Sequence, residues 1–156
     1  MNQLVRGLAS GAVGTVALNI TTYLDMAIRG RPASEMPAQA VREISRRAGL
    51  SLSEEGPDSE TAANRRSGLG ALLGYATGLG VGALYGIIRP HARSVPLPLA
   101  ALGLAITAMA GSDVPLTSLG LTDPRQWSPQ SWASDIVPHA AYGVMTALTF
   151  EAFNQE

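Results

Sequence analysis

The sequence predicts an all-α, polytopic membrane protein that folds as one domain over residues 1–156. Charged residues make up 15% of the chain, whereas soluble domains carry about 25%. Four stretches of 15 to 22 residues hold no Asp, Glu, Lys or Arg, and a helix needs about 20 largely apolar residues to cross a bilayer. Glycine stands at every fourth position from 70 to 86, a spacing typical of closely packed membrane helices.

Four transmembrane helices are expected. The spans are predicted at about residues 4–28, 67–89, 95–112 and 133–153. The first apolar run is longer than the core of a secretory signal, which covers about 7–15 residues. The last helix should begin near Pro129, because Ser128 is a good N-cap and proline suits the first helical position, and Pro138 predicts a kink within it. A soluble helical bundle is the alternative, but residues 67–88 offer no polar face to water.

Two longer polar segments, loop 29–64 and loop 113–128, connect the predicted spans. In the first, Pro37 begins a short amphipathic stretch in which Val41 and Ile44 share a face that the arginines avoid. This pattern indicates an interfacial helix on anionic lipid. A simple solvated connector is the alternative.

Glycines on the first two predicted spans are candidates for helix packing. In water each mid-helix glycine costs about 1 kcal/mol relative to alanine, whereas in a bilayer small residues let two backbones approach closely. The simplest partner for the second span is the first span of the same chain, and a homo-oligomeric glycine zipper is the alternative. The candidate packing residues are Gly7, Gly11 and Gly14 in the first span and Gly70, Gly74, Gly78, Gly82 and Gly86 in the second.

Composition and motifs argue against several functional classes. A net charge of −1, with two Trp and two Phe, supplies neither the basic surface nor the stacking platform of a nucleic-acid-binding protein. The absence of cysteine excludes disulfides and thiol chemistry. The sequence contains no nucleophile elbow, P-loop, dinucleotide fingerprint or HExxH motif, so neither an enzyme nor a cofactor is expected.

Ionisable residues gather on one predicted membrane face. With four spans, the first and third loops lie on the same side, and the acidic residues that adjoin them share that side. Asp135 and His139 are four residues apart, so they can pair along a helix, with Tyr142 continuing the same face. This pair is interpreted as mutually satisfied at the interface, as a proton relay, or as part of a metal site whose metal is unknown. The candidate polar site comprises Asp25, Asp113, Asp135, His139, Tyr142 and Glu151.

The arginines predict an orientation. Loops one and three hold eight arginines, and the remaining three lie in the termini and loop two. Since arginine is enriched in cytoplasmic loops, both termini are predicted to lie outside. Glu151, near the end of the fourth span, is interpreted as an interface residue or as a buried functional group.

The segment from Asp113 to Phe153 resembles the C-terminal part of YagU-like small bacterial inner-membrane proteins, over roughly a quarter of the chain. The resemblance implies a multi-span protein of the bacterial cytoplasmic membrane and singles out Asp135, His139 and Glu151 for testing. It also implies a cytoplasmic C-terminus, whereas the distribution of the arginines predicts that both termini lie outside. We retain the orientation that the arginines predict. The matching residues are Pro115, Leu116, Leu119, Gly120, Leu121, Thr122, Asp135, Ile136, His139, Tyr142 and Glu151.

The sequence therefore predicts an integral membrane protein that serves as a helix-packing assembly or accessory protein, or as a small permeation protein. The alternative is a proton- or metal-handling protein that uses Asp135 and His139. The expected partners are the lipid bilayer and either a second copy of the chain or another membrane subunit.

Overall fold

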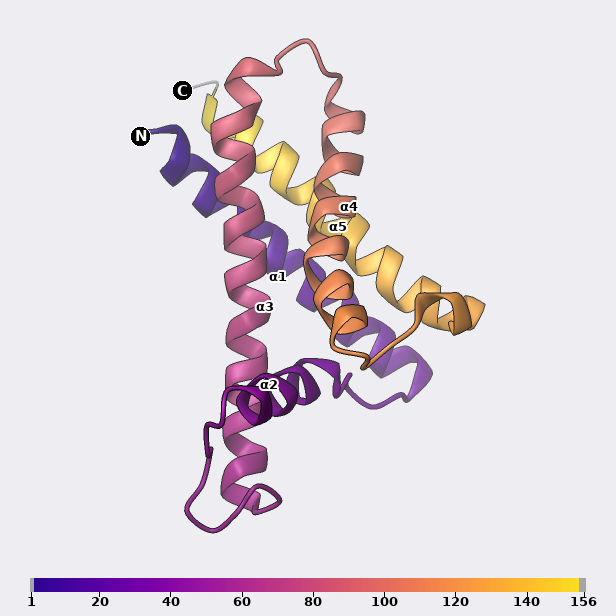
Figure 1. Ribbon diagram of the computed structural model, residues 1–156. Helices are drawn as coiled ribbons and strands as arrows, with labels where there is room; N and C mark the ends of the chain where they lie inside the picture. Colours follow the sequence, from indigo (N-terminus) through magenta and orange to yellow (C-terminus); the bar gives the residue numbers. More distant parts are fainter. Residues whose placement is uncertain (1, 155–156) are drawn as a thin grey trace.

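A computed structural model describes residues 2–154, which are helical and contain no strand. Five α-helices and two short 3-10 helices follow one another along the chain (Figure 1). In order they are α1 (Gln3–Arg29), α2 (Met36–Arg47), α3 (Glu60–Ile88), η1 (Arg89–His91), α4 (Leu97–Ser118), η2 (Pro124–Gln126) and α5 (Pro129–Asn154). The all-α fold class is confirmed.

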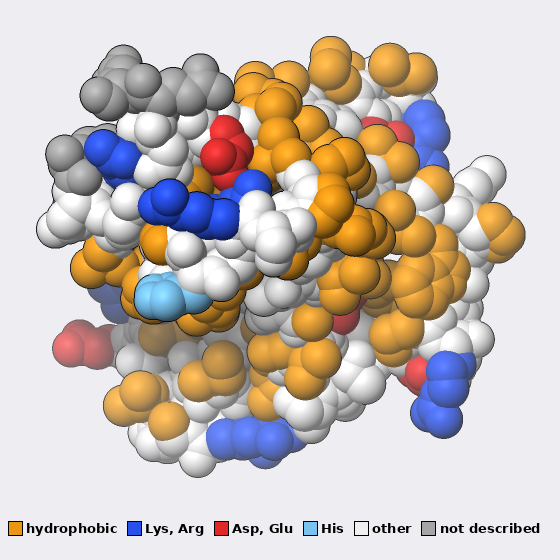
Figure 2. Space-filling model, turned by 90° about the horizontal axis from the view of Figure 1, so that it is seen from above, with side chains coloured by type: hydrophobic (Ala, Val, Ile, Leu, Met, Phe, Trp, Pro, Cys, Tyr) orange, Lys and Arg blue, Asp and Glu red, His pale blue; other side chains and the backbone are white. Residues whose placement is uncertain are grey.

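Three helices are long and apolar enough to cross a membrane: α1, the continuous segment Glu60–His91, and α4. α5 has 26 residues but is not one of these three; its apolar stretch is interrupted by Pro138, His139 and Glu151. Large apolar side chains lie on the outer surface, and Ile28 is 82% exposed. Figure 2 shows hydrophobic side chains over much of the end seen from above, with charged side chains in small groups. This surface is typical of a chain that contacts lipid.

Local signals set the ends of the long helices. The hydroxyl of Ser59 accepts a hydrogen bond of 3.2 Å from the backbone amide of Ala62 and caps the start of α3. Gly30, with a φ of 63°, ends α1 in the left-handed conformation that favours glycine. α4 continues to Ser118, past the predicted end of the third span at residue 112, and therefore contains Asp113. Pro115 lies in the last turn of α4, where it removes the backbone donor that would bond the carbonyl of residue 111.

The long helices form a curved row in which α1 lies between α3 and α5, and α5 lies between α1 and α4. α3 and α4 touch each other only slightly, whereas α2 packs on α3. In Figure 1, α1 and α5 run obliquely past α3, and α2 crosses α3 near its N-terminal end. The core contains Leu104, Tyr142 and Phe150. The ring of Phe150 meets that of Tyr85 edge-on at 5.0 Å.

α1 and α3 approach each other through their glycines. A Cβ atom placed on Gly82 would lie 2.5 Å from the Cα atom of Gly11 and 2.5 Å from the backbone oxygen of Gly7. Gly86 likewise lies against the backbone of Gly7. Only hydrogen fits in these places, so the intimate contact depends on glycine at these positions.

The other candidate packing glycines face different surroundings. A Cβ on Gly70 would meet the backbone of Pro37, which places this glycine against α2. Gly14 faces Tyr142 on α5, and Gly78 faces both Thr15 on α1 and Tyr142. Nothing lies within 4 Å of a Cβ on Gly74. The regular spacing of the glycines thus serves several contacts.

Candidate functional site

Asp113, Asp135 and His139 form a cluster at the end of the molecule that carries loops one and three. The Nδ1–H group of His139 donates a hydrogen bond of 2.8 Å to the backbone carbonyl of Asp135. The same nitrogen lies 3.3 Å from Oδ1 of Asp135. The two side chains are 13% and 20% exposed, so most of the cluster is removed from water. The Asp113 carboxyl interacts electrostatically with both.

Two features of the sequence position these groups. Asp135 and His139 are one helical turn apart on α5, which places them on a common face. Asp113 comes from α4, and the two helices approach closely at Gly143, where a Cβ would lie 2.8 Å from the backbone nitrogen of Ala105. A larger residue at position 143 would push α4, and Asp113 with it, away from α5.

Asp135 retains an unused hydrogen-bonding atom. Its Oδ2 atom is buried and has no hydrogen-bond partner among the described residues. Like charges repel where two carboxyl groups share a partly buried site. Histidine beside a carboxylate is a common proton acceptor near neutral pH. The chemistry of this cluster therefore suits reversible proton binding.

The buried face of α5 stays polar beyond His139. The hydroxyl of Tyr142 donates a hydrogen bond of 2.6 Å to the backbone carbonyl of Gly78 on α3. One turn later Thr146 is fully buried, and its hydroxyl has no partner in the described part of the chain. Phe150, also fully buried, follows one turn later on this face and is apolar. Tyr142 thus continues the face that carries the cluster, but its own bond ties α5 to α3.

The two remaining candidate residues lie apart from the cluster. Asp25 lies 2.6 Å from the NH2 nitrogen of Arg29 and 2.5 Å from Nε of Arg31. Glu151 lies 2.6 Å from Nε of Arg89, at the opposite end of α5. The structure therefore brings together three of the six candidates and places Asp25 and Glu151 in separate ion pairs.

The described residues contain no group of side chains arranged to bind a metal ion. Between residues 2 and 154, no three His, Asp or Glu side chains are placed so that they could hold one metal ion. In particular, the two carboxyls and the imidazole of the cluster do not form such a set.

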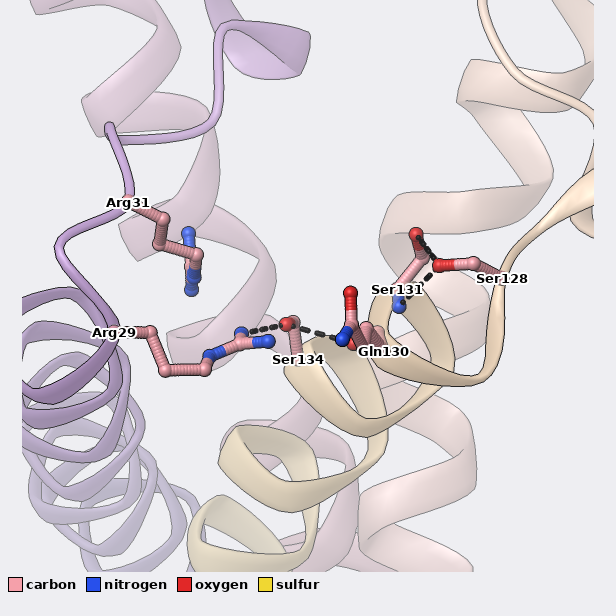
Figure 3. A pocket seen from close by; sticks show the side chains of 6 residues that line it. All are labelled: Arg29, Arg31, Ser128, Gln130, Ser131 and Ser134. Atoms are coloured by element: carbon pink, nitrogen blue, oxygen red, sulfur yellow. Dashed lines mark hydrogen bonds between the residues drawn. The ribbon is translucent and has the colours of Figure 1, made fainter.

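A polar pocket that the sequence analysis did not single out lies beside the cluster. It has a volume of about 400 Å³ and is lined by Arg29, Arg31, Ser128, Gln130, Ser131 and Ser134. Figure 3 shows the arginines facing the serines across this space. The available signals were the two arginines around Gly30 and the serines at every third position from 128 to 134.

Comparison with known proteins gives no relative. No family model, no curated protein and no solved structure matches the chain. The functional argument therefore rests on the geometry of these residues.

Proposed function

We propose that the chain is a proton-handling protein of the bacterial cytoplasmic membrane, in which Asp113, Asp135 and His139 bind a proton and exchange it with the polar face of α5. The observation that carries the proposal is the convergence of Asp113 from α4 with Asp135 and His139 from α5. This role corresponds to the alternative expected from the sequence, a proton- or metal-handling protein that uses Asp135 and His139. The resemblance to YagU-like proteins supports the choice of membrane.

The proposal includes four spans, with α5 as the fourth. A helix of 26 residues is about 39 Å long, which exceeds the hydrocarbon thickness of about 30 Å. α5 packs along α1 and α4, and its polar groups lie mainly on its buried face, so its low hydropathy does not require water around it. The glycine contacts between α1 and α3 support a glycine zipper between the first two spans. With the arginine-rich loops inside, both termini lie outside.

The membrane surface is the proposed environment of α2. Ile44 is 48% exposed on this helix, and Leu50, just beyond it, is 64% exposed. Val41 is buried against α3, which holds the helix in place. An arginine-rich helix with exposed apolar side chains suits the headgroup layer of anionic lipid.

Proton flux into liposomes tests the function. The full chain is reconstituted with a pH-sensitive dye inside the vesicles, and flux is driven by a potassium gradient with valinomycin. We expect His139→Ala to lower the flux about tenfold or more, because general acid–base groups contribute at least ~100-fold where they relay protons in enzymes. His91→Ala is the matched control, since His91 is the second histidine of the chain and is exposed. Equal flux in both variants would overturn the proposal.

Assembly with a second copy of the chain is the second candidate function, and one observation favours it. A Cβ added to Gly74 or Gly80 on α3 would meet no atom within 4 Å, so this part of α3 is free to accept a neighbouring helix. Native mass spectrometry in lipid nanodiscs tests it. Gly74→Leu on α3 should abolish the dimer. Gly103→Leu is the control, at a glycine of α4 where a Cβ also meets nothing within 4 Å, and should leave the dimer intact. A monomer in the unaltered protein would exclude this function.

A further inference from the structure

The pocket between the end of α1 and the start of α5 points to a second site, and we infer that it binds a phosphate group. The pocket is lined by two arginines and four uncharged polar side chains. It adjoins the proposed proton-binding cluster but shares no residue with it. This inference does not rest on the proposed function.

The charge of the pocket favours an anion. Asp25 is the one carboxylate that pairs with Arg29 and Arg31 within the described residues. Two guanidinium groups against one carboxylate leave a net positive charge beside the pocket. Asp25 also fixes the two guanidinium groups next to each other. Gly30 makes this possible, because its left-handed backbone turns the chain between them.

The two arginines retain donors for a ligand. Arg29 uses its NH2 group to bond Asp25 and Ser134. Arg31 uses Nε on Asp25 and NH1 on the backbone carbonyl of Pro32. Nε and NH1 of Arg29 and NH2 of Arg31 donate to no acceptor in residues 2–154. Figure 3 shows the guanidinium group of Arg31 within the pocket, with no bond to the other labelled side chains.

Hydroxyl groups face these donors from α5. Ser128 and Ser131 lie 2.9 Å apart through their Oγ atoms. The Ser128 hydroxyl also accepts a hydrogen bond of 3.1 Å from the backbone amide of Ser131, which holds both at the start of α5. Guanidinium forks with nearby hydroxyls match the oxygens of phosphate, which accept several hydrogen bonds at once.

The position of the pocket allows two sources of phosphate. It lies where the apolar helix α1 ends, at the level at which a lipid headgroup would meet a membrane-spanning helix. Trp127 and Trp132, whose rings pack edge-on at 5.0 Å, flank the serines along the chain, and such aromatics favour the headgroup layer. The phosphate of an anionic lipid and free inorganic phosphate present the same chemistry to this site.

The two tryptophans of the chain offer a local reporter. Their fluorescence is followed while the purified full chain, in phosphate-free detergent, is titrated with inorganic phosphate or with dihexanoyl phosphatidylglycerol at constant ionic strength. We expect saturable binding of at least one ligand. Arg31→Gln should weaken this binding about tenfold, because it removes a charged, forked donor. Arg125→Gln is the matched control: it removes a charge from the same end, and its side chain is 89% exposed.

Each outcome decides the inference. Tighter binding of the lipid than of inorganic phosphate identifies a headgroup site, and the reverse order identifies a site for free phosphate. If Arg31→Gln does not fold, Ser131→Ala takes its place and should also weaken binding. An unsaturable signal with both ligands, or equal weakening by Arg125→Gln and the pocket variant, would overturn the inference. Unchanged proton flux in Arg31→Gln would separate this site from the proton-binding cluster.

Discussion

The hydroxyl of Tyr142 on α5 donates a hydrogen bond of 2.6 Å to the backbone carbonyl of Gly78 on α3. Tyr142 is 1% exposed, and its ring lies against Gly14 of α1. One side chain therefore contacts the two helices that pack through glycine and ties them to the helix that carries Asp135 and His139.

Tyr142→Phe should lower the free energy of unfolding modestly. It removes one hydrogen bond worth about 0.5–1.5 kcal/mol but keeps the ring in place. Tyr142→Ala should cost more, about 3–5 kcal/mol, because it also leaves a cavity. Unfolding in mixed micelles at increasing SDS measures both. Equal losses in the two variants would show that the hydroxyl, not the ring, stabilises this junction.

Gly82→Ala should separate α1 from α3, because its Cβ would lie 2.5 Å from the Cα atom of Gly11. Gly68→Ala is the matched control, since the added methyl group on the same helix meets nothing within 4 Å. Thermal unfolding in lipid nanodiscs should show a lower transition temperature for Gly82→Ala and no decrease for Gly68→Ala. A similar transition temperature for both variants would contradict the glycine-mediated contact.

Single cysteines test the fourth span, and the natural sequence contains none that would need removal. Ala92→Cys, Arg125→Cys and Asn154→Cys are labelled with an impermeant maleimide in oriented membranes. If α5 crosses the bilayer, positions 92 and 154 label from one side and position 125 from the other, and the arginine count places position 125 inside. Labelling of positions 125 and 154 from the same side would exclude α5 as a span.

Glu43 should make the stability of the α2 helix depend on pH. Hydrogen bonds from Arg46 and then Arg47 hold the pKa of the Glu43 carboxyl at about 2, below its ordinary value of 4.5. Since the folded-state pKa is the lower one, the ionised carboxyl favours the folded state above about pH 4.5, and this contribution is lost as the pH falls towards 2. The effect should be small and weaken with salt, because Arg46 and Arg47 are 69% and 52% exposed.

Hydrogen exchange of the α2 amides measures this effect. The difference in protection between the unaltered chain and Glu43→Gln should shrink between pH 4.5 and pH 2. Glu54→Gln is the control, because Glu54 has no arginine partner among the described residues. A difference that stays constant across this range would show that these ion pairs do not stabilise the α2 helix.

Much of the helical order could be predicted because the signals are local. Pro129 begins α5, as the sequence indicates, and Ser59 caps α3 through its own hydroxyl. The pairing of α1 with α3 follows from small residues on both helices. Which glycines make the contact cannot be predicted from their spacing, because this register depends on how all the helices cross. Gly70 faces α2, and Gly74 faces open space.

The candidate site shows the same division. The i, i+4 spacing of Asp135 and His139 predicts their pairing, and the parity of the loops predicts only that Asp113 lies on the same side. How close Asp113 lies to Asp135 and His139 depends on the contact of α4 with α5 at Gly143. The pocket around Arg31 needs both the turn at Gly30 and the approach of α5 to the end of α1, which no single sequence spacing encodes.

Infrared difference spectroscopy tests the central claim most directly, because a protonated carboxyl group has a carbonyl band that a carboxylate lacks. A pH jump on the reconstituted chain should produce such a band, and both Asp113→Asn and Asp135→Asn should remove or shift it, whereas Asp123→Asn, in the loop before η2, should leave it unchanged. A band that survives both cluster substitutions would contradict proton binding by Asp113, Asp135 and His139.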